Sequence, residues 1–205
     1  MQPASRYTNV AIALHWIIAL GIVINITLAW LWPHSLPDDA VRPAIDTHKS
    51  IGVTILGLAF LRLLWRFSHR PPPMPTTYQK WETAAAHWAH VLLYVILFLQ
   101  PLTGWIMDSA YKDAALHPMH YFGTFEFPRI AWIQQLQQPL KEQIHSGFGK
   151  VHEYTAYVLY ALLIAHIGGA LKHQLLDREP EIQRMLPGWS AITRSGAIRY
   201  SREQN

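Results

Sequence analysis

The stretch that decides the fold is residues 150–175, which has the sequence KVHEYTAYVLYALLIAHIGGALKHQL. It is long and apolar enough for a helix that crosses a hydrocarbon core of about 30 Å. It carries two histidines, His152 and His166, which stand fourteen positions apart. Because fourteen residues make close to four helical turns, both imidazoles point from nearly the same face, about 21 Å apart along the axis.

Three further apolar segments have a similar length, at residues 9–32, 48–67 and 83–107. Proline-rich residues 70–75 separate the second segment from the third, and Pro43 is expected to open the second helix. Residues 108–147 contain aromatics and prolines and predict a partly helical cap. Hydrophobic residues make up 51% of the chain and charged residues 15%, against about 25% charged in soluble domains. The sequence therefore predicts an all-α integral membrane bundle of four helices.

We expect one transmembrane domain at residues 5–186 and a polar cytoplasmic tail at residues 187–205, with the chain lying at the surface beyond Leu176. Four crossings place eleven of the 17 Lys and Arg residues on the side of both termini and six on the other side. The positive-inside rule then puts both termini in the cytoplasm and the cap in the periplasm of a bacterial inner membrane. The net charge of +4 and the pI of about 9.4 follow this distribution between membrane sides, so we expect no nucleic-acid partner.

The chain has no cysteine but has twelve histidines. The absence of cysteine excludes disulfides, iron–sulfur ligation and covalently attached haem, so any haem must be held non-covalently. A histidine inside a membrane is costly unless it is paired or binds a ligand, and neutral imidazole is a good iron ligand. By depth, His48 can meet His152 near the outer face, and His15 can meet His166 near the inner face. The sequence predicts two six-coordinate haems held by these pairs; the alternative is that the histidines only form hydrogen bonds within the bundle or at its interface.

His87 and His90 lie at about the depth of His15, and either of them could replace it as the inner ligand. Side chains near the inner end are candidate contacts of a haem propionate or of a quinone, and small residues allow a macrocycle or a neighbouring backbone to approach. The candidate contacts are His87, His90, Arg62, Arg66, Lys172 and His173, and the small residues are Gly52, Gly57, Gly104, Gly168 and Gly169.

Several short strings together resemble the bacterial cytochrome b561 family, which is related to the di-haem cytochrome b subunits of nickel–iron hydrogenase and formate dehydrogenase. The likeness covers about residues 5–186. The strings are Leu14-His15-Trp16, His48-Lys49-Ser50-Ile51-Gly52, Arg62-Leu63-Leu64-Trp65-Arg66, Ala86-His87-Trp88-Ala89-His90, Pro101-Leu102-Thr103-Gly104-Trp105, Val151-His152-Glu153 and Ala165-His166. The resemblance implies two non-covalent haem b groups, held by the first helix with the late fourth helix and by the second with the early fourth helix. It also implies ubiquinone as the electron partner on the inner side.

The favoured function is a conduit that carries electrons between a periplasmic donor and quinone. The donor could be superoxide, which would make the protein an oxidoreductase, or a redox protein that docks on the cap. Five cations of the outer face are candidates for steering the superoxide anion: Lys49, Lys112, Arg129, Lys141 and Lys150. A function of a different class, a histidine-lined metal or proton transporter, would use the same histidines without haem. Such transporters usually show repeats or broken helices, and the sequence shows neither.

Overall fold

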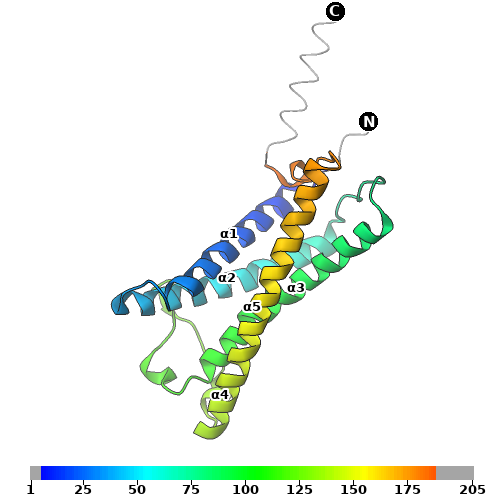
Figure 1. The fold of residues 1–205 in the computed structure, drawn as a ribbon. Helices are drawn as coiled ribbons and strands as arrows, with labels where there is room; N and C mark the ends of the chain where they lie inside the picture. Colours follow the sequence, from blue (N-terminus) through cyan, green and yellow to red (C-terminus); the bar gives the residue numbers. More distant parts are fainter. Residues whose placement is uncertain (1–5, 188–205) are drawn as a thin grey trace, which may run out of the picture.

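The computed structural model describes residues 6–187. Four long helices make up most of it (Figure 1), and each is long and apolar enough to cross a membrane. The long helices are α1 (Asn9–Leu31), α2 (Asp38–Ser68), α3 (Lys80–Ser109) and α5 (Gln138–Leu175), and the short elements are η1 (Ala114–Leu116), β1 (His120–Tyr121), β2 (Phe125–Glu126), α4 (Ala131–Gln134) and η2 (Gln183–Met185). The prediction of an all-α four-helix membrane bundle is confirmed.

Two of the helices begin well before the apolar segments that indicated them. α2 starts at Asp38, so Pro43 lies inside this helix and the prediction that Pro43 opens it was wrong. Asp38 and Asp39 occupy the first turn, where carboxylates interact favourably with the positive end of the helix dipole. α5 starts at Gln138 with a proline in its first turn, a position where the missing N–H costs nothing. Both extensions are polar, which is why they lay outside the apolar segments that indicated the two helices.

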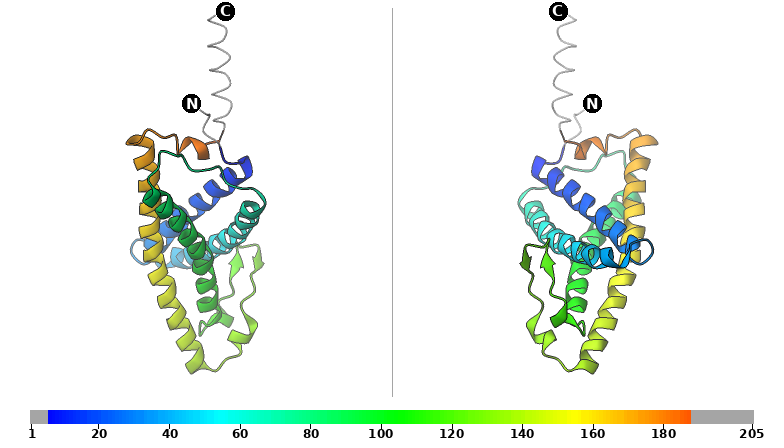
Figure 2. Two further views of the ribbon diagram at one scale, coloured as in Figure 1. Left: turned by 90° about the vertical axis from the view of Figure 1, so that its right-hand side faces the viewer. Right: turned by 90° about the vertical axis from the view of Figure 1, so that its left-hand side faces the viewer.

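The helices pack most extensively as α3 with α5 and as α1 with α2, and α2 also packs against α3. The start of α1 and the end of α5 lie at the same end of the bundle (Figure 1), and β1, β2 and α4 lie at the opposite end (Figure 2). Large apolar side chains cover the outside of the bundle; Leu20 is 62% exposed and Ile164 75% exposed. Such a surface is suited to lipid rather than to water.

The connector between α3 and α5 is folded, as predicted, although the sequence did not indicate its hairpin. β1 and β2 are antiparallel with Tyr121 opposite Phe125, and Gly123 takes the left-handed φ of 71° in the turn between them. The Ser50 hydroxyl of α2 accepts a hydrogen bond from the Phe122 backbone N–H at 3.0 Å. The guanidinium of Arg129 donates to the Asp108 carboxylate at 2.8 Å, which ties the connector to the end of α3.

The segment after α5 does not simply lie at the surface. Arg184 is 6% exposed and donates to the carbonyl of Pro73 at 2.7 Å, and the Trp16 indole donates to the carbonyl of Met185 at 2.6 Å. These contacts hold the segment against the end of the bundle because a buried guanidinium needs its donors satisfied. The predicted tail, residues 187–205, lies outside the described residues apart from its first residue.

Candidate haem-binding site

The outer part of the bundle brings together His48 of α2 and His152 of α5. Their ring centres are 6.2 Å apart and their planes are inclined at 70°. The Nδ1 atom of His48 lies 3.1 Å from the carbonyl oxygen of Asn25, and Nδ1 of His152 lies 3.0 Å from the carbonyl oxygen of Gln100. Because a carbonyl can only accept, Nδ1 carries the proton in both rings and Nε2 is left with a lone pair for a metal.

Two features of α3 make room for His152 and orient it. A Cβ atom built on Gly104 would lie 3.3 Å from Cε1 of His152, so the imidazole packs directly on the helix backbone. The Thr103 hydroxyl lies 3.1 Å from Nδ1 of His152, and its own proton is donated to the carbonyl of Leu99 at 2.8 Å. The sequence analysis named Gly104 as a site of close approach but missed Thr103 and Gln100. Pro101 and Gly104, which flank this part of α3, were the available signal.

The inner part of the bundle brings together His15 of α1 and His166 of α5. Their ring centres are also 6.2 Å apart, with planes inclined at 67°. His90 of α3 stands beside the same ring, with its centre 5.4 Å from that of His166. His87 is exposed and its ring lies against Trp88 at 5.8 Å. Of the two alternatives to His15, only His90 therefore shares this cluster.

Helix α5 supplies one histidine to each pair, and it is continuous from Gln138 to Leu175. The two pairs therefore lie about 21 Å apart along this helix, at 1.5 Å per residue. The histidines that were paired by depth in the sequence lie side by side in space, with one pair in each half of the bundle.

The candidate contacts at the inner end separate into two groups. Arg62 donates to the Tyr94 hydroxyl at 3.2 Å and to the carbonyl of Ala11 at 3.1 Å, one helical turn before His15. Arg66 lies over the ring of Tyr94 at 5.8 Å. These two arginines are near the inner histidines. Gly52, in contrast, faces the outer half of the bundle. A Cβ atom added to Gly52 would lie 3.8 Å from the side-chain amide of Asn25.

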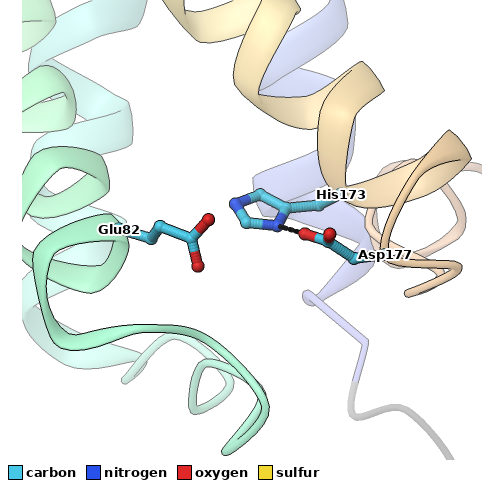
Figure 3. Close-up of side chains that lie close together, drawn as sticks. All are labelled: Glu82, His173 and Asp177. Carbon is cyan, nitrogen blue, oxygen red and sulfur yellow. Dashed lines mark hydrogen bonds and ion pairs between the residues drawn. The ribbon is translucent and has the colours of Figure 1, made fainter.

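Lys172 and His173 belong to a charged cluster at the end of α5. The Lys172 ammonium donates to the Glu82 carboxylate and, at 2.7 Å, to Asp177. Figure 3 shows His173 between Glu82 and Asp177, with its Nδ1 atom 2.6 Å from the Asp177 carboxylate. Oxygen and nitrogen atoms of Glu82, His173 and Asp177 lie within 4.8 Å of one another, but the lysine ammonium already bridges the two carboxylates. Lys172 thus offsets part of the negative charge of the two carboxylates.

Asp177 of this cluster and the neighbouring Tyr78 lie outside the membrane-spanning helices, and both have shifted pKa values. The hydrogen bond from Lys172 holds the pKa of Asp177 below its usual value. Burial raises the pKa of Tyr78 above its usual range, as does its hydrogen bond to Glu181. The ring of Tyr78 stacks on His173 with centres 3.9 Å apart, so the aromatic pair closes one side of the cluster.

Comparison with known proteins identifies the family of this chain. Residues 6–188 match the family described as prokaryotic cytochrome b561. The chain belongs to the prokaryotic cytochrome b561 family. Cytochrome b561 homolog 2 of Escherichia coli (strain K12) is 30% identical over 184 residues, covering 88% of this chain and 91% of that protein. Cytochrome b561 homolog 1 of the same organism is 26% identical over 187 residues, covering 89% and 98%.

Membership of the cytochrome b561 family, together with four membrane helices, makes the chain a multi-pass inner-membrane protein that binds haem b and transfers electrons. The family resemblance drawn from the sequence strings is confirmed.

Proposed function

We propose that the protein holds two haem b groups and carries electrons across the inner membrane, between a donor at the periplasmic face and ubiquinone at the cytoplasmic end. The observation that carries this proposal is the identical spacing of two histidine pairs, His15 with His166 and His48 with His152, in opposite halves of the bundle. The proposed axial ligands are these four histidines.

The spacing agrees with ligation of one iron by each pair. An imidazole nitrogen binds a metal at about 2.0–2.1 Å, and the centre of the ring lies about 1.2 Å behind that nitrogen. Two imidazoles on opposite sides of one ion therefore have ring centres about 6.5 Å apart. Both pairs measure 6.2 Å, while His90 and His166 at 5.4 Å are too close for this geometry. This comparison favours His15 over His90 and leaves His90 beside the macrocycle.

The carbonyls of Asn25 and Gln100 support the same role for the outer pair. A ligating histidine almost always donates its second ring N–H to an oxygen, which fixes the tautomer and the ring orientation. His48 and His152 both do so. When bound, haem iron supplies one-electron transfer between its ferric and ferrous states. If two of these histidines held each iron, no position would be left open for oxygen, and the protein would act by holding, orienting and insulating the redox centres.

The cytoplasmic end offers groups suited to quinone reduction, which consumes two electrons and two protons for each quinol. Lys172, His173 and Asp177 form a titratable hydrogen-bonded cluster near the end of α5. Lys172 and His173 lie about two turns beyond His166 on α5, and Asp177 follows just after the helix ends. This placement supports a ubiquinone site at the inner end, with the protons taken from the cytoplasm.

The outer end favours a redox protein over superoxide as the donor. Of the five cations that could steer an anion, Lys49 and Arg129 are paired with Asp108 at 2.6 and 2.8 Å. Lys141 is 8% exposed and donates to the carbonyl of Gln134. The cap instead presents apolar side chains such as Phe125, 55% exposed, and Trp132, 63% exposed, which are typical of a protein contact. Stopped-flow mixing with superoxide tests the choice: haem reduction faster than spontaneous dismutation would favour superoxide.

The deciding experiment is the haem content of the purified protein, measured with a dithionite-reduced minus oxidised spectrum. We expect two low-spin b-type haems per chain. One haem would show that one of the two histidine pairs does not bind iron. No haem in protein expressed with ample haem supply would refute electron transfer and favour the histidine-lined transporter. His48→Ala serves as the matched variant and is expected to retain only the inner haem.

A further inference from the structure

A cavity of about 230 Å³ lies at the end of the bundle where α1 begins and α2 ends. Its walls come from the start of α1, the end of α2, the proline-rich connector and Tyr94 of α3. Four arginines line it: Arg6, Arg62, Arg66 and Arg70. The lining contains no carboxylate. Four guanidinium groups around one cavity repel one another unless an anion lies among them.

No side chain of the described chain supplies that anion. Within residues 6–187, none of these four arginines forms an ion pair with Asp or Glu. Arg6 and Arg62 donate to the backbone carbonyls of Leu186 and Ala11, and Arg66 lies over the Tyr94 ring. Arg70 is exposed and lines the cavity. The cluster on the opposite side of the same end differs in this respect, since Lys172 has two carboxylate partners there.

The surroundings of the cavity match the headgroup level of a membrane. Trp65 lines the wall, where its indole donates to the Thr8 hydroxyl at 2.8 Å and its ring stacks on His69 at 3.8 Å. Tryptophan is enriched at this depth, and Phe67 of the same helix is 77% exposed on the apolar outside. The excess of Lys and Arg assigns this end to the cytoplasm, and basic pockets between membrane helices on that side bind the headgroups of anionic lipids.

We propose that this cavity binds the phosphate group of an anionic phospholipid of the cytoplasmic leaflet, with its acyl chains along the outside of α2. Arginine suits this role because its planar guanidinium pairs with two phosphate oxygens at once. The lipid phosphate would offset part of the positive charge of the arginine cluster and join α1, α2 and the proline-rich connector at the membrane surface. Arg66 and Arg70 contact the phosphate from the α2 side, and Arg6 closes the site from α1.

The test uses native mass spectrometry of the full-length, haem-loaded protein in detergent, titrated with phosphatidylglycerol, phosphatidylcholine or inorganic phosphate. We expect phosphatidylglycerol to bind in preference to phosphatidylcholine, and inorganic phosphate to compete only weakly. Each arginine near a lipid phosphate contributes about 1 kcal/mol, a factor of about 5 in affinity. We therefore expect Arg70→Gln to weaken phosphatidylglycerol binding about 5-fold and Arg66→Gln with Arg70→Gln about 30-fold. Arg70→Lys, which keeps the charge, should restore part of it.

Lys80→Gln is the matched control, because Lys80 is an exposed cation at the same end that does not line the cavity. Equal losses in Lys80→Gln and Arg70→Gln would overturn the proposal, since binding would then follow net charge alone. Inorganic phosphate that binds as tightly as the lipid would also overturn it in favour of a soluble anion. Unchanged lipid binding in the double variant, with loss of the inner haem, would assign the arginines to haem propionates instead.

Discussion

Replacement of Gly104 by alanine tests the outer histidine pair without removing a ligand. The added Cβ would lie 3.3 Å from Cε1 and 3.5 Å from Nδ1 of His152, whereas carbon atoms in comfortable contact lie about 3.5–4.0 Å apart. The imidazole must therefore move away by a few tenths of an ångström. Its Nδ1 hydrogen bond to Gln100, now 3.0 Å, lengthens or bends with it.

The expected loss follows from the role of such orienting contacts. Disturbing the hydrogen-bond partner of a metal-ligating histidine typically weakens metal binding 10- to 100-fold. We therefore expect Gly104→Ala to weaken binding of the outer haem by about that factor and to leave the inner haem unchanged. A weaker helix cannot cause this result, because alanine in place of a helical glycine stabilises the helix by about 0.8–1 kcal/mol.

The assay is haem per chain, with a redox titration of the b-type bands, for protein produced under limiting haem supply. Gly147→Ala in α5 is the control, since a Cβ at Gly147 would meet no atom within 4 Å. It gains the same helix propensity and should behave as wild type. If Gly104→Ala kept both haems with an unaltered titration while haem was limiting, His152 would not be an iron ligand in this position.

Three further outcomes follow from the contacts. His15→Ala should lose the inner haem while His90→Ala retains it, measured as haem per chain; the reverse result would make His90 the ligand. Asp108→Ala should lower the melting temperature by roughly 10 °C, because breaking a buried pair costs about 3–5 kcal/mol and the Arg129 side chain is only 5% exposed; the exposed Glu142→Ala should change little. Asp177→Asn should flatten the pH dependence of thermal stability on the acid side, because the pKa of Asp177 is lowered in the folded protein. The stability that this carboxylate contributes is complete above its unfolded pKa of about 3.9. It is lost as the pH falls through the folded pKa. Equal slopes for both proteins below pH ~5 would contradict this.

The membrane helices and the depths of their histidines were predictable because both depend on local sequence. Apolar runs of membrane length fix where helices cross, and a rise of 1.5 Å per residue fixes how deep each histidine lies. This was enough to pair His48 with His152 and to place His15, His87 and His90 at the level of His166. It was not enough to choose between His15 and His90, because depth does not say which faces of three helices turn toward one another.

The features that the sequence did not reveal depend on contacts between distant segments. The apolar segment placed the start of the second helix at residue 48, although Asp38, Asp39 and Pro43 belong to its first turns. Gln100 became visible as a partner of His152 only when α3 packed against α5. The segment after Leu176 is polar, yet Arg184 is buried against prolines more than a hundred residues earlier. Polarity predicts solvent exposure only where no buried acceptor is available.

The construction of both sites around α5 has a mechanical consequence. Because one unbroken helix supplies His152 and His166, the separation of the two pairs depends on helix geometry alone and not on how α1 and α2 pack. α1 and α2 each contribute one partner and can adjust independently to its ring. In the proposed function, electron transfer between two haems would need a fixed separation, whereas ligation would need local adjustment of each pair. The fold meets the first need with a continuous helix and the second with two separate ones.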